Sequence, residues 1–246
     1  MLGLLLTTKI MASKNNIRNS ILSFVAGVFL ISFITACGSS GNASPSGLNI
    51  QYEVLNLSPD LSPVNLYVNY NLVNTSPFVF SVYNGYFYVP SIVLPYQIRS
   101  ALGSQLPIFN RNDSLRSGAK YSLFITGTEG NSQLAQIFTV DTATIPAIGR
   151  GKIRFVNASP TGTLGLDLYA NGTPAFHKIT HPGYSDFIEI PVGNYDLQIN
   201  ATGTTSVLKD MPGITIQDGR LYTIYAYGYT TRSDSAAFNA SIITNK

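Results

Sequence analysis

The sequence is poor in the residues that most often carry chemistry. Its 246 residues include one cysteine, two histidines and no tryptophan, and only 11% are charged. A single cysteine excludes an internal disulfide, so stability in an oxidising compartment must come from packed apolar cores. The chain has no Gly-x-Ser-x-Gly motif, no calcium loop of the D-x-D-x-D-G type and no glycine-rich phosphate loop that opens a helix. Common sequence signatures of hydrolases and nucleotide-binding enzymes are therefore missing.

The one cysteine follows an apolar run, ILSFVAGVFLISFITA, at residues 21–36. As a helix this run would rise about 24 Å, less than the ~30 Å of a bilayer core. Lys14 and Arg18 precede it and no acidic residue occurs before Cys37, which is the layout of a secretory signal. The tetrapeptide ITAC, ending at Cys37, resembles a bacterial lipobox. That resemblance implies cleavage before Cys37 and a diacylglycerol on its sulfur. The alternative is an ordinary signal peptide that ends near a buried cysteine.

The lipobox interpretation divides the N-terminal region into two parts. Residues 1–36 are a signal peptide, for which Met11 is a more natural start than Met1, and residues 37–47 are a lipidated tether rich in Gly, Ser and Asn. Stable anchoring takes two acyl chains, and a lipidated Cys37 carries two or three, palmitate among them. We expect a membrane-anchored protein of the cell envelope. Gly38 is not the aspartate that retains some lipoproteins at the inner membrane, which favours the outer membrane, on its periplasmic or surface-exposed face.

Removal of the signal peptide changes the charge. Residues 1–36 contain Lys9, Lys14 and Arg18 and no acid, so the net charge falls from +3 to 0. A basic field that would attract nucleic acid or anionic lipid therefore has no support, and we expect no nucleic-acid partner.

An internal repeat organises the remaining chain. The pairs NLSP/NASP, NLYVN/DLYAN, NGY/PGY and SGAKYSL/DGRLYTI recur in one order at offsets of 98 to 102 residues, beginning at Asn56 and Asn157. We predict two tandem domains, residues 48–141 and 152–246, joined by a linker at residues 142–151.

Each copy is typical of a series of short strands. In residues 152–158, Ile153 and Phe155 alternate with Lys152 and Arg154, and Asn171-Gly172 is a strong hairpin signal. We expect further strands at residues 164–170, 186–190, 195–200, 206–209, 221–228 and 236–244, and no helix. About seven strands in 95 residues predict an all-β fold of two Ig-like antiparallel sandwiches.

The second copy resembles a known family. The runs IRFVNASP from Ile153, LDLYANG from Leu166, IPVGNYDL from Ile190 and GRLYTI from Gly219 resemble the domain-of-unknown-function family DUF4397 over nearly all of that copy. The family recurs in secreted and lipid-anchored bacterial proteins, and the resemblance implies β-sandwich architecture. The first copy departs from it at residues 91–95 and 104–114.

Titratable residues give no convincing catalytic or metal site. His177 and His181 have helical spacing, but the prolines around them disfavour a helix, and in a strand they would lie about 13 Å apart. Exposed loop histidines are the better interpretation. Asp186, Glu189 and Asp196 are ordinary acids on strand faces. We therefore expect no metal, no cofactor and no enzyme.

Tyrosines are the one feature that could carry recognition. Tyr225, Tyr227 and Tyr229 share one face of a predicted strand, and Tyr86 and Tyr88 form a second cluster. They either fill a sandwich core or form a platform for sugar rings or a peptide. The sequence thus favours a non-enzymatic structural or adhesive module of the envelope. The alternative is a carbohydrate- or peptide-binding lipoprotein that uses an exposed tyrosine face, with a glycan or envelope protein as partner.

Overall fold

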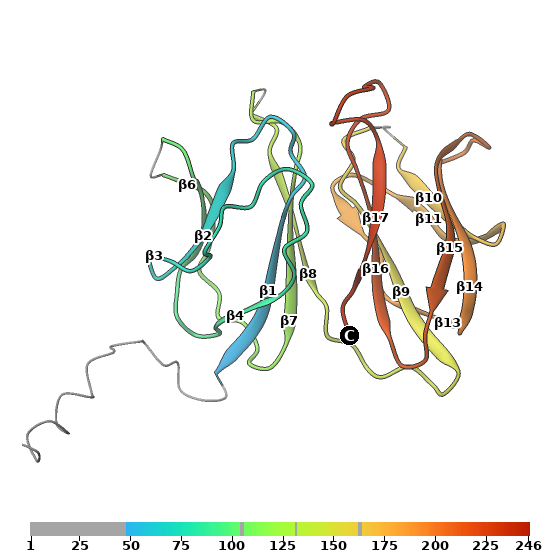
Figure 1. Cartoon of the computed structure of the whole chain (residues 1–246), viewed down its shortest axis with the longest axis horizontal. Coiled ribbons are helices and arrows are strands. Elements are labelled where there is room, and N and C mark those ends of the chain that lie inside the picture. The colour runs from blue at the N-terminus through green and yellow to red at the C-terminus, as the bar shows by residue number, and fades with distance from the viewer. Residues whose placement is uncertain (1–47, 104–105, 131, 162–163) are drawn as a thin grey trace, which may run out of the picture. The chain divides into compact units, whose positions relative to one another are not determined.

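The computed structural model describes residues 48–103, 106–130, 132–161 and 164–246 (Figure 1). Cys37, the predicted signal peptide and the predicted tether lie outside these residues. The described chain is all-β and contains no helix, as the sequence predicts. Accordingly, no helix in this part of the chain is long and apolar enough to cross a membrane. Residues 44–246 form one compact unit.

The first sandwich consists of two four-stranded sheets. Its inner sheet has the order β4-β1-β7-β8 and its outer sheet the order β3-β2-β5-β6. The strands are β1 (Asn49–Asn56), β2 (Val64–Val68), β3 (Asn71–Leu72), β4 (Phe87–Pro90), β5 (Tyr96–Ser100), β6 (Pro107–Arg111), β7 (Lys120–Thr126) and β8 (Ala135–Val140).

The second sandwich has the same plan. Its inner sheet has the order β12-β9-β16-β17, with β13 also on β9, and its outer sheet has the order β11-β10-β14-β15. The strands are β9 (Arg150–Asn157), β10 (Leu166–Ala170), β11 (Thr173–Ile179), β12 (Gly183–Tyr184), β13 (Ile188–Pro191), β14 (Gly193–Ala201), β15 (Val207–Ile216), β16 (Leu221–Tyr227) and β17 (Asn239–Thr244).

Strand pairing repeats from one sandwich to the other. Each inner sheet contains one parallel pair, β1 with β7 and β9 with β16, and the other pairs are antiparallel. Glu53 lies opposite Ser122 in the first parallel pair, and Arg154 lies opposite Thr223 in the second, so both members shift by 101 residues. The predicted Asn171-Gly172 hairpin is confirmed: both residues have positive φ angles between β10 and β11. Asn69 and Tyr70 form the equivalent turn between β2 and β3.

Each sandwich encloses its own apolar core, and a third core joins the two. Along β1, Tyr52 and Val54 face the core of the first sandwich, whereas Leu55, and Leu57 just after the strand, belong to the third cluster. This shared core takes buried residues from both inner sheets, and each fully buried side chain of this size contributes about 1.5–3 kcal/mol. Its buried members are Leu55, Leu57, Phe124, Ile137, Val156, Ala158, Tyr225, Tyr227 and Ile243.

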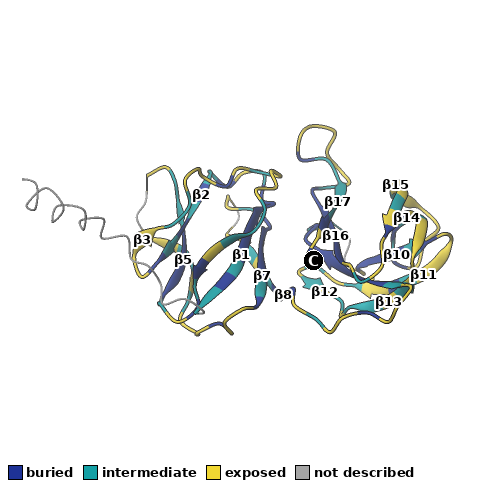
Figure 2. Ribbon diagram, turned by 60° about the horizontal axis from the view of Figure 1, so that its bottom comes forward, coloured by how far each residue is buried: buried dark blue, intermediate teal, exposed yellow. Residues whose placement is uncertain are grey.

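The shared core explains why the central strands are buried on both faces. All seven residues of β16 are buried, as its dark blue colour in Figure 2 indicates, and so are all but the first residue of β7 and of β9. The sequence alternation of Ile153 and Phe155 with Lys152 and Arg154 separates two faces of β9. Both faces are buried, because the polar one faces the first sandwich. Lys152 is 9% and Arg154 only 2% exposed.

Candidate functional site

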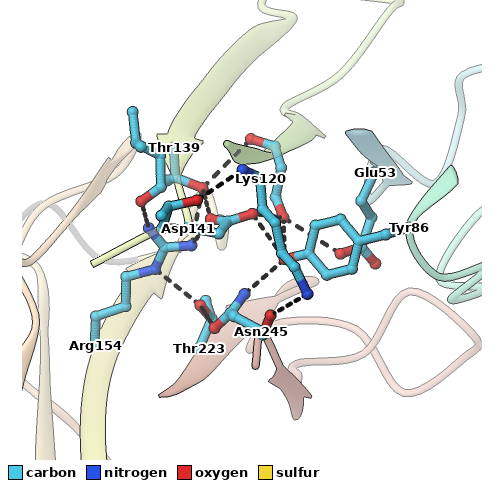
Figure 3. Close-up of polar contacts among 11 residues, drawn as sticks. Glu53, Tyr86, Lys120, Thr139, Asp141, Arg154, Thr223 and Asn245 are labelled. Atoms are coloured by element: carbon cyan, nitrogen blue, oxygen red, sulfur yellow. Dashed lines mark hydrogen bonds and ion pairs between the residues drawn. The ribbon is translucent and has the colours of Figure 1, made fainter. Parts of the chain in front are cut away.

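A cluster of polar side chains lies buried between the two inner sheets, beside the shared core (Figure 3). We call it the polar junction. Glu53 comes from β1, Ser122 from β7, Arg154 from β9 and Thr223 from β16, and all four are at most 2% exposed. The remaining members are Tyr86, which precedes β4, Thr139 on β8, Asp141 just after β8 and Asn245 just after β17.

Asp141 is the centre of the polar junction. Its carboxylate accepts hydrogen bonds from Tyr86 Oη at 2.7 Å, Ser122 Oγ at 2.6 Å and Thr139 Oγ1 at 2.8 Å. The same carboxylate forms a buried ion pair with the Arg154 guanidinium of the other sandwich. With four donors around it, this carboxylate has the partners that a buried charge requires.

Arg154 is held from both sandwiches as well. Its Nε donates to Thr223 Oγ1 at 2.8 Å and its Nη1 donates to the Val140 carbonyl at 2.9 Å. Thr223 Oγ1 in turn donates to Asn245 Oδ1 at 2.7 Å, and Asn245 Nδ2 donates to Tyr86 Oη at 2.7 Å. The hydrogen bonds therefore form a closed circuit across the boundary between the sandwiches.

The two halves of the polar junction occupy equivalent positions. Glu53 and Ser122 in the first sandwich correspond to Arg154 and Thr223 in the second. Asp141 also has a counterpart, because its amide donates to the first residue of β7 and the Asn245 amide donates to the first residue of β16. Each hydroxyl donates to the residue that follows the edge strand. One repeated motif thus carries acids in one sandwich and a cation with a neutral amide in the other.

Glu53 is the member without a full set of partners. Its Oε2 lies 3.3 Å from Ser122 Oγ, and its Oε1 has no hydrogen-bond partner among the described residues. Burial, and then the charge of Asp141, raise the pKa of Glu53 to about 8. A single guanidinium faces two carboxyl groups here, and it pairs with Asp141. We infer that Glu53 is a neutral acid at neutral pH.

The polar junction is suited to holding the sandwiches together rather than to catalysis. A catalytic group must reach a substrate, and all members except Tyr86 are buried beneath the two sheets. Burial, and then the charge of Asp141, also raise the pKa of Tyr86, so its hydroxyl stays protonated and remains a donor. A small cavity lies elsewhere, in the first sandwich beside Tyr52 and Phe109, and its volume of about 10 Å³ has room for roughly one water molecule.

The tyrosines named from the sequence divide between the two predicted alternatives, core and platform. Tyr225 and Tyr227 are 3% and 9% exposed and stack on each other in the shared core with ring centres 5.8 Å apart. These two residues therefore follow the core alternative, because their strand face meets the other sandwich. Tyr229 is half-buried, with its hydroxyl 3.5 Å from the Gly127 carbonyl, and Tyr86 is in the polar junction. Tyr88 alone is strongly exposed, at 73%.

The two histidines have different surroundings. His177 is on the edge strand β11. This strand was not predicted from the sequence, because Pro174 is disfavoured inside a sheet. At a sheet edge, proline is tolerated. Its Nδ1 lies 3.0 Å from Asp167 Oδ1. His181 Nε2 lies 3.2 Å from Thr126 Oγ1, and burial lowers the pKa of His181. Within the described ranges no group of three or more His, Cys, Asp or Glu residues is arranged to hold a metal ion.

The acids named from the sequence also have structural contacts. Glu189 lies 3.5 Å from the Arg150 guanidinium and 3.6 Å from Lys152 Nζ. Asp196 accepts a hydrogen bond from the Gly213 amide at 2.9 Å. The Asp186 carbonyl accepts a hydrogen bond from Ser185 Oγ at 3.0 Å. The structure does not bring the three carboxylates together into one described cluster.

One family model matches the chain. Residues 51–164 match DUF4397, a domain of unknown function. The match runs from β1 through the first sandwich and past the end of β9, slightly less than half of the chain. The sequence resemblance was expected on the second copy. Only its first run, from Ile153 to Pro160, lies inside the match. No curated protein matches the chain.

The sequence contained one signal for the polar junction that sequence reasoning missed. Glu53 and Arg154 stand 101 residues apart, as do Ser122 and Thr223, which is the offset of the repeat. A charged residue at the same position of a strand in both copies indicates a shared buried role. Single-strand alternation, read one copy at a time, assigns such residues to solvent.

Proposed function

We propose that the chain is a lipid-anchored protein of the cell envelope whose two sandwiches act as one rigid, non-enzymatic structural or adhesive module. The observation that carries the structural part is the joint formed by the shared core and the polar junction. It pairs a deeply buried titratable group of each sandwich, Asp141 with Arg154, and leaves both without access to a substrate. A stiff double sandwich suits a module that acts as a spacer in the envelope or holds its loops away from the anchor.

The anchor part of the proposal rests on the sequence around Cys37. The test is metabolic labelling of the full-length protein in a bacterial host with an alkynyl palmitate, alongside the variant Cys37→Ser. We expect the wild type to take up label and to partition into detergent, and Cys37→Ser to do neither. A wild type without label, or a variant that is equally hydrophobic, would overturn the anchor.

We also propose that the two sandwiches arose by tandem duplication of one DUF4397-like, Ig-like unit, with domains at residues 48–141 and 152–246. The equal registers of the two parallel strand pairs and the equivalent halves of the polar junction support this proposal. Expression of residues 142–246 alone tests the autonomy of the second unit. A duplicated unit should show β-sheet circular dichroism, although exposure of Tyr225 and Tyr227 should lower its solubility.

A second candidate is recognition of a glycan or peptide, and one patch favours it. On the outer sheet of the first sandwich, the Arg99 guanidinium lies 4.7 Å from the ring centre of Tyr67 and 5.9 Å from that of Tyr70. Tyr70 is 64% exposed, and Arg99 Nε has no hydrogen-bond partner among the described residues. A glycan array with wild type and Tyr67→Ala tests this candidate. Flat signals, or equal signals for both proteins, would count against it.

A further inference from the structure

The parallel strand pairs of the two inner sheets, β1 with β7 and β9 with β16, all start at one end of the compact unit. Gln51 at the start of β1 pairs with Lys120 at the start of β7, and Lys152 pairs with Leu221 in the second sandwich. Lys120 Nζ donates to the Asn245 carbonyl at 2.7 Å, which aligns the starts of β7 and β16 across the joint. We call this the proximal end. Its turns are residues 91–95, 112–119, 141–149, 192 and 217–220.

The chain that leads to the predicted anchor leaves the folded unit at the proximal end. Ser91 fixes this exit, because its amide and its hydroxyl each donate to the Leu48 carbonyl at 2.8 Å. Ten residues separate Cys37 from Leu48. Gly/Ser-rich linkers of ten residues have in general an average end-to-end distance of about 16–19 Å. If Cys37 is anchored, the tether holds the proximal end close to the lipid headgroups.

The proximal turns present aliphatic side chains to solvent. Ile148 is 98% exposed, Ile145 70% and Ile92 55%, and the segment between β8 and β9 that carries the first two is mostly exposed (Figure 2). Val192 is also exposed, and its amide donates to the Gly149 carbonyl, which places it beside Ile148 in the turn. Single exposed apolar residues are common, but here they gather at the end from which the tether leaves.

The two ends of the unit differ in their exposed charges. At the proximal end, Arg116 and Arg220 are exposed and form no ion pair among the described residues, and the same turns carry two exposed acids, Asp113, which pairs with Arg111, and Asp218. At the opposite end, the loops carry the exposed acids Asp60, Glu129 and Asp234 against one loop cation, Arg232. An anionic lipid surface attracts exposed arginines and repels the acidic loops.

We propose that the proximal end is a lipid-docking surface, on which Ile92, Ile145 and Ile148 enter the headgroup region of the membrane that holds the anchor. Arg116 and Arg220 contact lipid phosphates. The docking fixes the long axis of the strands relative to the membrane and points the opposite loops away from it. This inference rests on the proposed anchoring, and its occupant is a phospholipid surface.

The absence of tryptophan makes the test direct, because a single introduced tryptophan is the only one in the chain. The protein from Cys37 to Lys246 contains the whole compact unit. The thiol of Cys37, the one cysteine, is coupled to a maleimide-headgroup lipid in vesicles of phosphatidylcholine and phosphatidylglycerol. This chemical tether works whether or not a cell lipidates Cys37. The reporter is Ile148→Trp, and the matched control is Leu102→Trp, 67% exposed in the β5–β6 turn at the opposite end.

Quenching by lipids brominated near the headgroup end of the acyl chains is then measured. We expect Ile148→Trp to lose about half of its emission and to shift to the blue, and Leu102→Trp to change little. Adding Ile145→Asp to the reporter should restore most of the emission. Adding Leu164→Asp should not, because Leu164, which is 60% exposed, lies between β9 and β10 at the opposite end. Equal quenching of reporter and control, or none in either, would overturn the docking surface.

Three further outcomes separate this inference from its alternatives. A blue shift without bromine quenching that grows with protein density on the vesicle would mean contact between copies and would overturn lipid docking. A wild type that fails palmitate labelling but shows the reporter quenching on the chemical tether would overturn the proposed anchor alone. A labelled protein without quenching would retain the anchor and overturn the docking surface.

Discussion

Replacing Glu53 with glutamine keeps the shape of the side chain and removes its titratable carboxyl proton from the polar junction. In the folded chain, burial and the charge of Asp141 raise the pKa of Glu53 from 4.5 to about 8, whereas the unfolded chain exposes this group to water. Between these two values, the folded state holds a proton that the unfolded state has released. Rising pH therefore favours unfolding across this window, because the unfolded state binds fewer protons there.

The size of the effect follows from the width of that window. Each pH unit between 4.5 and 8 costs the wild type about 1.4 kcal/mol of unfolding free energy, and the whole window costs about 5 kcal/mol. Glu53→Gln has no proton to lose and avoids this cost. Its advantage over the wild type should thus be near zero at pH 5, should grow steadily to pH 8 and should level off above it.

The assay is urea unfolding of both proteins at unit steps from pH 5 to 9, followed by circular dichroism. The difference in unfolding free energy between the two proteins cancels the titration of groups that they share. Glu189→Gln is the matched control for the substitution itself, because Glu189 is partly exposed and lies outside the polar junction. A pH-independent difference for Glu53→Gln would refute the inference of a neutral buried acid.

Three further substitutions test the joint and one turn by the same unfolding assay. Arg154→Met leaves Asp141 buried without its cation and should lower the unfolding free energy by about 3–5 kcal/mol; a loss below 1 kcal/mol would contradict the geometry of the ion pair. Phe124→Ala opens a cavity in the shared core and should cost about 3–5 kcal/mol, and a small cost would mean that the sandwiches barely touch. Tyr70→Gly relieves a φ of 65° and should raise the unfolding free energy by roughly 0.5–1 kcal/mol after loss of the Arg99 contact; a decrease would show that the tyrosine side chain matters more than the backbone.

Local signals predicted much of the fold. The Asn171-Gly172 dipeptide predicted its hairpin because both residues tolerate positive φ, and the spacing of turn residues predicted an all-β chain. Strand β11 was missed because Pro174 is tolerated at a sheet edge, and sequence alone does not identify the edge.

The joint between the sandwiches could not be predicted from single strands. The central strands are buried on both faces, so the alternation of apolar and polar residues on β9 does not indicate exposure. Arg154 on β9 pairs with Asp141, which follows β8 in the other sandwich. Arg154 and Asp141 meet because two sheets pack together, which no local pattern encodes. Tyr225 and Tyr227 were ambiguous for the same reason, since a tyrosine face suits both a ligand platform and an interface.

The central claim is that two sandwiches form one rigid module, and the most direct measurement is the cooperativity of their unfolding. Differential scanning calorimetry of the chain from Cys37 to Lys246 compares the calorimetric with the van't Hoff enthalpy. A shared core and a closed polar circuit predict one transition with a ratio near one. Two resolved transitions, or a single broad one with a ratio near two, would mean that the sandwiches unfold independently and would contradict the account.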